Sequence, residues 1–139
     1  MGTSKRIINI EGIGSQYSRK LENAGIKTTK DLLKACRTPR ERDELARSSG
    51  VGHKLLLEWA NRADLWRIKG VAEEYSDLLE NTGVDTVVEL SKRNPDNLYE
   101  MLMAKAHATG HRIVRRPPSK KQVASWVSQA KKLPRMLEY

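Results

Sequence analysis

The chain has 139 residues and a net charge of +9, and its 38% of hydrophobic residues include no phenylalanine. Cys36 is the only cysteine, which excludes an internal disulfide, and no apolar run is long enough for a signal peptide or a membrane span. We therefore expect a protein of the reducing cytoplasm without membrane contacts. Good helix formers dominate, and β-branched residues never alternate over a sustained run, which favours an all-α fold.

The positive charge is unevenly distributed along the chain. Residues 1–70 carry 15 basic and 8 acidic side chains, residues 71–104 carry 2 basic and 8 acidic, and residues 105–137 carry 9 basic and no acidic ones. A purely basic segment attracts phosphate because binding releases counterions. Surface Lys and Arg also keep proteins soluble, so composition alone leaves both explanations open.

An internal repeat sets the domain organisation. A shift of 58 residues aligns ten identical residues between positions 10–33 and 68–91. Further along the matching shift is 67 residues, as Trp59 and Trp126 illustrate, so the second copy has an insertion of about nine residues near 105–118. We expect two domains, residues 1–66 and residues 67–139, the second with the insertion and a basic C-terminal segment.

Each copy is expected to consist of short helices, opened by residues that cap or start a helix. In the first copy Ser15 is expected to cap a helix to Ala24, and Thr28 or Thr29 to cap a second helix through Cys36. Thr38 with Pro39 opens a third predicted helix to about Ser48, and a fourth runs from His53 to about Leu65. The second copy follows the same plan, with a helix from Asn94 and Pro95 to about Ala108 and a last helix capped by Ser119 and ending near Leu133.

The most informative motif precedes the first helix. Residues Ile10 to Gly14 have the pattern apolar, any, Gly, apolar, Gly, which resembles the hairpin of the helix-hairpin-helix family. Two glycines around an apolar residue allow a sharp turn that exposes N–H groups at the start of the next helix, while the apolar residue anchors the turn in the core. These N–H groups and the positive end of the helix dipole form a site for a phosphate oxygen.

A second hairpin of this kind is found at Gly50, Val51 and Gly52, so the first copy resembles a paired helix-hairpin-helix domain. With the repeat, this resemblance implies two consecutive paired helix-hairpin-helix units with a SAM-like fold. The resemblance implies sequence-independent binding of duplex DNA through the minor-groove backbone, as such modules do in recombinases, repair nucleases and topoisomerases. Two units in one small chain also resemble a bacterial family described as a domain of unknown function. The predicted nucleic-acid contacts are Gly12, Ile13, Gly14, Arg19, Lys20, Gly50, Val51, Gly52, Lys54, Arg115, Arg116, Lys120 and Lys121.

The second copy departs from the first motif. Ala72 stands where the first copy has Gly14, and the next helix opens with Glu73 and Glu74. Carboxylates at this place satisfy the helix N-terminus themselves and repel a phosphate. We therefore interpret this turn as structural.

The counterpart of the second hairpin also lacks glycine. It contains Pro117 and Pro118, with basic residues on either side of a helix start: Arg115, Arg116, Lys120 and Lys121. This segment either binds phosphate by charge or is a solvated loop.

Other chemistry has little support in the sequence. His107 and His111 have the spacing of metal ligands on a helix, but no third ligand accompanies them. Cys36 lacks a recognisable catalytic His and Asn or Asp. Trp59 and Trp126 are equivalent in the repeat and are predicted to be core residues, whereas Trp66 either packs between the copies or is exposed. We expect no metal site, no cofactor and no enzyme activity.

These observations predict a non-catalytic protein that binds nucleic acid, in particular duplex DNA. The alternative is a protein–protein interaction adaptor or scaffold, because paired hairpin units also serve as contact surfaces and the second copy begins with acidic residues. A protein partner, or another copy of the chain, would then contact Glu73, Glu74, Asp77 and Trp66.

Overall fold

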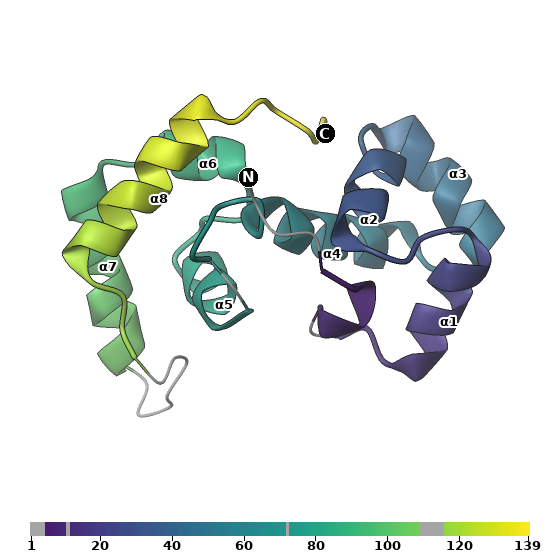
Figure 1. Ribbon diagram of the computed structural model, residues 1–139, viewed down its shortest axis with the longest axis horizontal. Helices are drawn as coiled ribbons and strands as arrows, with labels where there is room; N and C mark the ends of the chain where they lie inside the picture. The colour runs from purple at the N-terminus through teal and green to yellow at the C-terminus, as the bar shows by residue number, and fades with distance from the viewer. Residues whose placement is uncertain (1–4, 11, 72, 109–115) are drawn as a thin grey trace. The chain divides into compact units, whose positions relative to one another are not determined.

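The computed structural model describes residues 5–10, 12–71, 73–108 and 116–139, and of residues 73, 74, 107 and 108 it describes the backbone alone. Over these residues the regular secondary structure is helical, and the one extended pairing is an isolated antiparallel bridge between Arg6 and Thr28. The predicted all-α class is confirmed (Figure 1). The insertion expected near residues 105–118 falls largely on residues 109–115, which lie outside this description.

The chain divides into two compact units. The first unit consists of Thr3–Asp64 together with Arg135–Tyr139, and the second unit of Leu65–Pro134. The boundary lies two residues before the position expected from the repeat. The last five residues, which we expected in the second domain, group with the first unit.

The helices of the two units correspond in order. The first unit contains the short 3-10 helix η1 (Ile7–Asn9), α1 (Ser15–Asn23), α2 (Thr29–Ala35), α3 (Pro39–Ser49) and α4 (His53–Leu65), except that the last residue of α4 groups with the second unit. The second unit contains α5 (Glu73–Asn81), α6 (Val87–Ser91), α7 (Pro95–Ala108) and α8 (Lys120–Lys132). In the first unit α1 and α2 pack against α3, and in the second α6 and α7 pack against α8. The sequence repeat is thus also a repeat of helices, from α1–α4 to α5–α8.

Most helices begin next to the residue predicted from the sequence as their N-cap. Thr28 caps α2, since its Oγ1 accepts the N–H of Asp31 at 3.1 Å while the Asp31 carboxylate accepts the N–H of Thr28 at 3.2 Å. Thr38 and Ser119 cap α3 and α8 in the same way, through the N–H three residues further on. The prediction that Ser15 caps α1 is wrong: Gly14 occupies the N-cap position, and Ser15 is the first helical residue. Glycine is acceptable at an N-cap, so the helix begins one residue earlier.

Each unit contains a glycine that lies against an indole. Gly12 has a φ of +93°, and a Cβ there would lie 3.4 Å from Nε1 of Trp59; Gly70 has a φ of +96°, and its Cβ would lie 3.2 Å from Nε1 of Trp126. A tyrosine packs against each indole with ring centroids 5.1 Å apart, Tyr17 in the first unit and Tyr75 in the second. A positive φ and an indole in the side-chain space require glycine at both positions.

The tryptophans belong to the cores. Trp59 is 4% exposed and Trp126 is 2% exposed, which confirms that both are core residues. Trp66 is also only 2% exposed, and its Nε1–H donates to Oγ of Ser76 at 3.1 Å within the second unit. Trp66 is therefore buried rather than exposed, and a contact of this residue with a partner protein stays a prediction.

Residues 135–139, the tail segment, complete the first unit around a buried arginine. Arg42 on α3 is 2% exposed, and its guanidinium donates to the carbonyl oxygens of Cys36 at 2.7 Å and of Glu138 at 2.8 Å. The N–H of Glu138 donates to the carbonyl of Arg37 at 2.7 Å, and the side chain of Leu137 is buried. The carbonyls supply the polar partners that a buried guanidinium needs.

Candidate nucleic-acid interface

The first glycine turn (residues 12–14) combines an exposed backbone with a buried anchor. Gly12 and Gly14 are exposed, whereas the side chain of Ile13 between them is 4% exposed. Gly14 is the N-cap residue of α1, in an extended conformation, and no side chain caps the helix there. The carbonyl of Gly14 accepts the N–H of Ser18 at 2.9 Å, which closes the first turn of α1.

The second glycine turn (residues 50–52) has the same construction between α3 and α4. Gly50 ends α3 in the left-handed conformation with a φ of 76°, and Val51 is 1% exposed. Gly52 is exposed, and its carbonyl accepts the N–H of Leu56 at 3.1 Å, which closes the first turn of α4. The Oγ of Ser49 accepts the N–H of Val51 at 3.2 Å and fixes the turn. Both predicted hairpins thus bury their apolar residue and expose their glycines.

The two glycine turns leave the helix starts of α1 and α4 open. The first N–H groups of any helix lack a partner within the helix and carry the positive end of its dipole. In α2, α3, α6 and α8 a Thr or Ser side chain accepts one of these N–H groups. Gly14 and Gly52 have no side chain to do so, and a Cβ at either position would meet nothing within 4 Å. The space beside the Cα atom of both glycines is therefore open.

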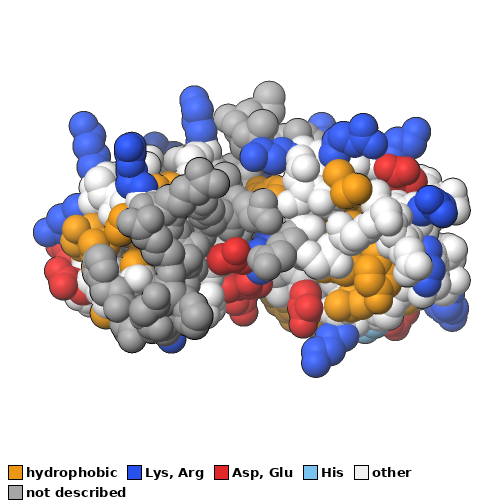
Figure 2. Space-filling view, turned by 90° about the horizontal axis from the view of Figure 1, so that it is seen from below, with side chains coloured by type: hydrophobic (Ala, Val, Ile, Leu, Met, Phe, Trp, Pro, Cys, Tyr) orange, Lys and Arg blue, Asp and Glu red, His pale blue; other side chains and the backbone are white. Residues whose placement is uncertain are grey.

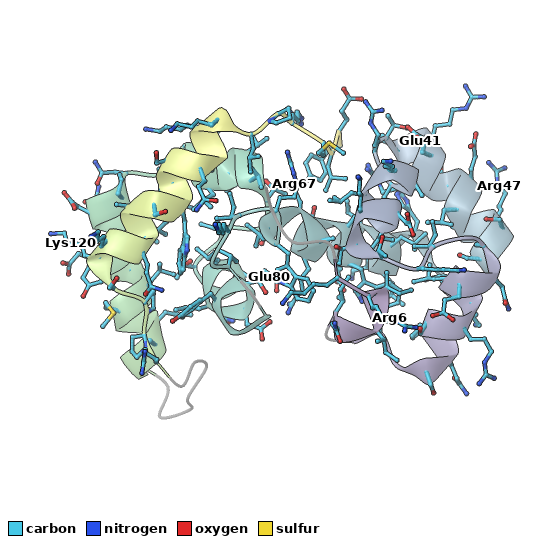
Figure 3. All side chains as sticks on the ribbon, viewed as in Figure 1. Arg6, Glu41, Arg47, Arg67, Glu80 and Lys120 are labelled. Carbon is cyan, nitrogen blue, oxygen red and sulfur yellow. The ribbon has the colours of Figure 1, made fainter. Side chains whose placement is uncertain are left out.

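Lys54 lies in the first turn of α4, whereas Arg19 and Lys20 lie beyond the first turn of α1, with Lys20 in its last turn. Arg19, Lys20 and Lys54 are all exposed, as a phosphate contact requires. The ammonium of Lys20 lies 5.7 Å from the ring centre of Tyr17, and Arg6 pairs with Glu22 at 3.5 Å (Figure 3). On the face that Figure 2 draws, Lys and Arg side chains project from the surface with Asp and Glu among them.

A hydrogen-bonded group adjoins the second glycine turn. His53, the first residue of α4, accepts the Nε–H of Arg42 on its Nε2 at 3.3 Å, and its Nδ1 lies 3.4 Å from Oδ1 of Asp43. Arg42 thereby joins the start of α4 to the tail segment. No sequence pattern singles out Arg42, because an arginine among the alternating charges of α3 is indistinguishable from a solvated one.

The corresponding turn of the second unit is only partly described. Gly70 is exposed and Val71 is 4% exposed, as in the first unit. Ala72 and the side chains of Glu73 and Glu74 lie outside the described part of the chain. Asp77, half-buried on α5, is the described member of the predicted acidic contact.

The basic residues around α8 have a different environment from those of the first unit. Ser119 and Gln122 form a reciprocal cap, with Oγ of Ser119 accepting the N–H of Gln122 at 3.1 Å and Oε1 of Gln122 accepting the N–H of Ser119 at 2.9 Å. Lys120 lies 3.6 Å from Oδ1 of Asp96 (Figure 3), and Arg116 and Lys121 are exposed. Arg115 lies outside the described residues. At the start of α8, the side chains of Ser119 and Gln122 therefore accept hydrogen bonds from backbone N–H groups.

The described residues present neither a reactive cysteine nor a cluster of metal ligands. Burial raises the pKa of the Cys36 thiol to about 12, so this cysteine is a core residue in its neutral form. Among the residues that the structure describes, no group of three His, Cys, Asp or Glu side chains is placed to hold a metal ion. The side chain of His107 and all of His111 fall outside that part of the chain. None of the described helices is both long and apolar enough to span a membrane.

Comparison with known families gives one match. A family model described as "Domain of unknown function (DUF4332)" matches residues 11–133. The chain belongs to this family. The DUF4332 match includes both glycine turns and most of each unit, and the tail segment follows it. No curated protein and no solved structure matched the chain.

Proposed function

We propose that this DUF4332 protein binds duplex DNA without sequence preference and without catalysing a reaction, and that its first unit acts as a paired helix-hairpin-helix domain. The observation that carries the proposal is the shared construction of the two glycine turns. Each buries its central side chain, Ile13 or Val51, and presents a glycine N-cap to solvent.

The proposed contacts follow from the chemistry of these turns. The N–H groups at the starts of α1 and α4 would donate to phosphate oxygens, assisted by the helix dipoles. Lys54 would add charge from the first turn of α4, and Arg19 and Lys20 from the later turns of α1. Backbone amides read no base edges, so these contacts position the protein without specifying a sequence.

Fewer features of the second unit support the same mode of binding. The reciprocal cap at Ser119 and Gln122 occupies N–H groups at the start of α8. Any phosphate held near Arg116, Lys120 and Lys121 would be held by charge alone.

The competing proposal is a protein-interaction adaptor, supported by the acidic balance of residues 71–104, which carry 8 acidic and 2 basic side chains. Trp66, the aromatic residue predicted for such a contact, is 2% exposed, which weakens this alternative. An adaptor would ignore DNA at physiological salt and would lose its partner on substitution of Glu73 and Glu74.

The glycine N-caps permit a test that leaves the fold intact. Gly14→Asp and Gly52→Asp place a favourable N-cap residue in open space, so the stability of the protein should be unchanged or slightly raised. The new carboxylate occupies the N–H groups and repels phosphate, and each variant should bind a short duplex roughly tenfold more weakly. Binding is titrated against duplex and single-stranded DNA at about 50 mM and about 200 mM salt.

The matched controls are Gly14→Ala and Gly52→Ala, which add neither a cap nor a charge. They should keep wild-type affinity within about twofold. Equal affinity of the Asp and Ala variants would contradict a role for the helix starts, and salt-independent or absent DNA binding by the wild type would favour the adaptor.

A further inference from the structure

The outer side of α8 is a basic surface that the glycine turns do not include. Its inner side is buried, with Val123, Trp126, Val127 and Ala130 each no more than 2% exposed. The opposite side is exposed, and we call it the α8 outer face: Lys121, Ala124, Ser125, Ser128, Lys131 and Lys132.

The spacing of these residues places them along one stripe of the helix, because positions three, four and seven apart share a face. Lysines stand at both ends, roughly 15 Å apart along the axis at about 1.5 Å per residue. Between them are only small side chains, so a chain-like ligand can lie close to the helix. The oxygen of Ser125 accepts from Nε2 of Gln129 at 3.2 Å, which leaves the hydroxyl proton of Ser125 to donate to a ligand.

The positive charge of the α8 outer face is not balanced by nearby carboxylates. Lys120, at the start of the helix, lies 3.6 Å from Asp96, whereas no carboxylate of the described residues lies within 4 Å of Lys121, Lys131 or Lys132. The sequence reinforces this imbalance, since residues 105–137 contain no acidic side chain.

We propose that the α8 outer face is a second contact surface for the nucleic-acid backbone, independent of the glycine turns. The inference rests on the proposed function and extends it to the second unit. The stripe has lysines at both ends and small side chains between them. This arrangement is complementary to a nucleic-acid backbone, which carries phosphate charges at regular intervals. It does not fit a lipid surface, because an interfacial helix needs an exposed apolar face and the apolar side of α8 is in the core. It also lacks the aromatic anchors of protein interfaces.

The test compares two sets of three exposed lysines in the full chain. One variant carries Lys121→Gln, Lys131→Gln and Lys132→Gln; the control carries Lys27→Gln, Lys30→Gln and Lys34→Gln around α2, with the same change in net charge. Duplex affinity is measured over a range of salt concentrations. The α8 variant should bind roughly tenfold more weakly at low salt, and the slope of log K against log salt should fall by about 2 to 3, at about 0.9 per lost phosphate contact. The control should change the slope by less than about one.

The outcomes separate this proposal from that of the glycine turns. If the α8 variant matches the α2 control while Gly14→Asp weakens binding, the second surface is wrong and the proposed function stands. If the α8 variant loses affinity and slope while Gly14→Asp binds normally, the second surface stands without the helix starts. If the wild type binds vesicles of phosphatidylcholine and phosphatidylserine but no DNA, and the α8 variant loses that binding, the face is a lipid surface and both proposals fail.

Discussion

Gly70 and Gly14 are both turn glycines, yet only one of them depends on being glycine. Gly70 has a φ of +96°, and a Cβ would press against the indole of Trp126 at 3.2 Å. Gly14 has a φ of −83° and open space around it. A strained backbone conformation of the first kind costs a side chain about 1–3 kcal/mol.

We therefore expect Gly70→Ala to lower the free energy of unfolding by about 1–3 kcal/mol. Gly14→Ala, the control, should lower it by less, about 0.5 kcal/mol, because its backbone is unstrained and alanine is only a poorer N-cap residue than glycine. Urea denaturation followed by tryptophan fluorescence measures both. Equal midpoints for the two variants would show that the contact with Trp126 does not constrain this position.

At the scale of the helices, the capping box of α2 links stability to pH. The N–H of Lys27 donates to the carboxylate of Asp31 at 3.1 Å and, with hydrogen bonds from Thr28, holds the pKa of Asp31 below its usual 3.8. A carboxyl whose pKa is lowered on folding stabilises the protein at any pH above its pKa in the unfolded state. That contribution disappears as the pH falls through its pKa in the folded state.

Asp31→Asn should accordingly lower the stability at pH 7, by about 0.5 kcal/mol for loss of the charge at a helix N-terminus. The difference from the wild type should shrink as pH falls below 3.8 and vanish once Asp31 is protonated in both states. Thermal unfolding at a series of pH values gives the comparison, with the exposed Glu58→Gln as control. A difference that persists undiminished in acid would assign the effect to the amide rather than to the charge.

Helix boundaries were predictable because local chemistry decides them. Thr38 with Pro39 and Ser119 mark starts that the structure reproduces, and the glycine turns bury Ile13 and Val51 as expected. The cap of α1 was misassigned because two adjacent residues can both serve as N-cap, and packing chooses between them. The burial of Arg42 was not predictable, since its partner Glu138 is 96 residues away in the sequence.

At the scale of the whole molecule, the first unit is built from two segments of the chain that are separated by the second unit. The tail segment follows the second unit in sequence but groups with the first, where Leu137 is 2% exposed. Truncating a buried leucine to alanine costs about 2–5 kcal/mol. The resulting loss of stability should therefore occur in the first unit, which contains the tail segment.

Leu137→Ala should speed amide hydrogen exchange in α3 and leave exchange in α8 near the wild-type rate, as measured by mass spectrometry of peptic fragments. Met136→Ala, at the half-buried neighbouring position, is the control and should have a smaller effect. Faster exchange in α8 with no change in α3 would contradict the grouping of the tail segment with the first unit.

The tail segment also has a consequence for folding during translation. The ribosome makes the 70 residues of Leu65–Pro134 after Asp64 and before the tail segment. At roughly 5–20 residues per second, this interval lasts about 4 to 14 seconds. During that time the guanidinium of Arg42 lacks its bond to the carbonyl of Glu138, so the nascent first unit stays less stable than its finished form until the second unit has been synthesised.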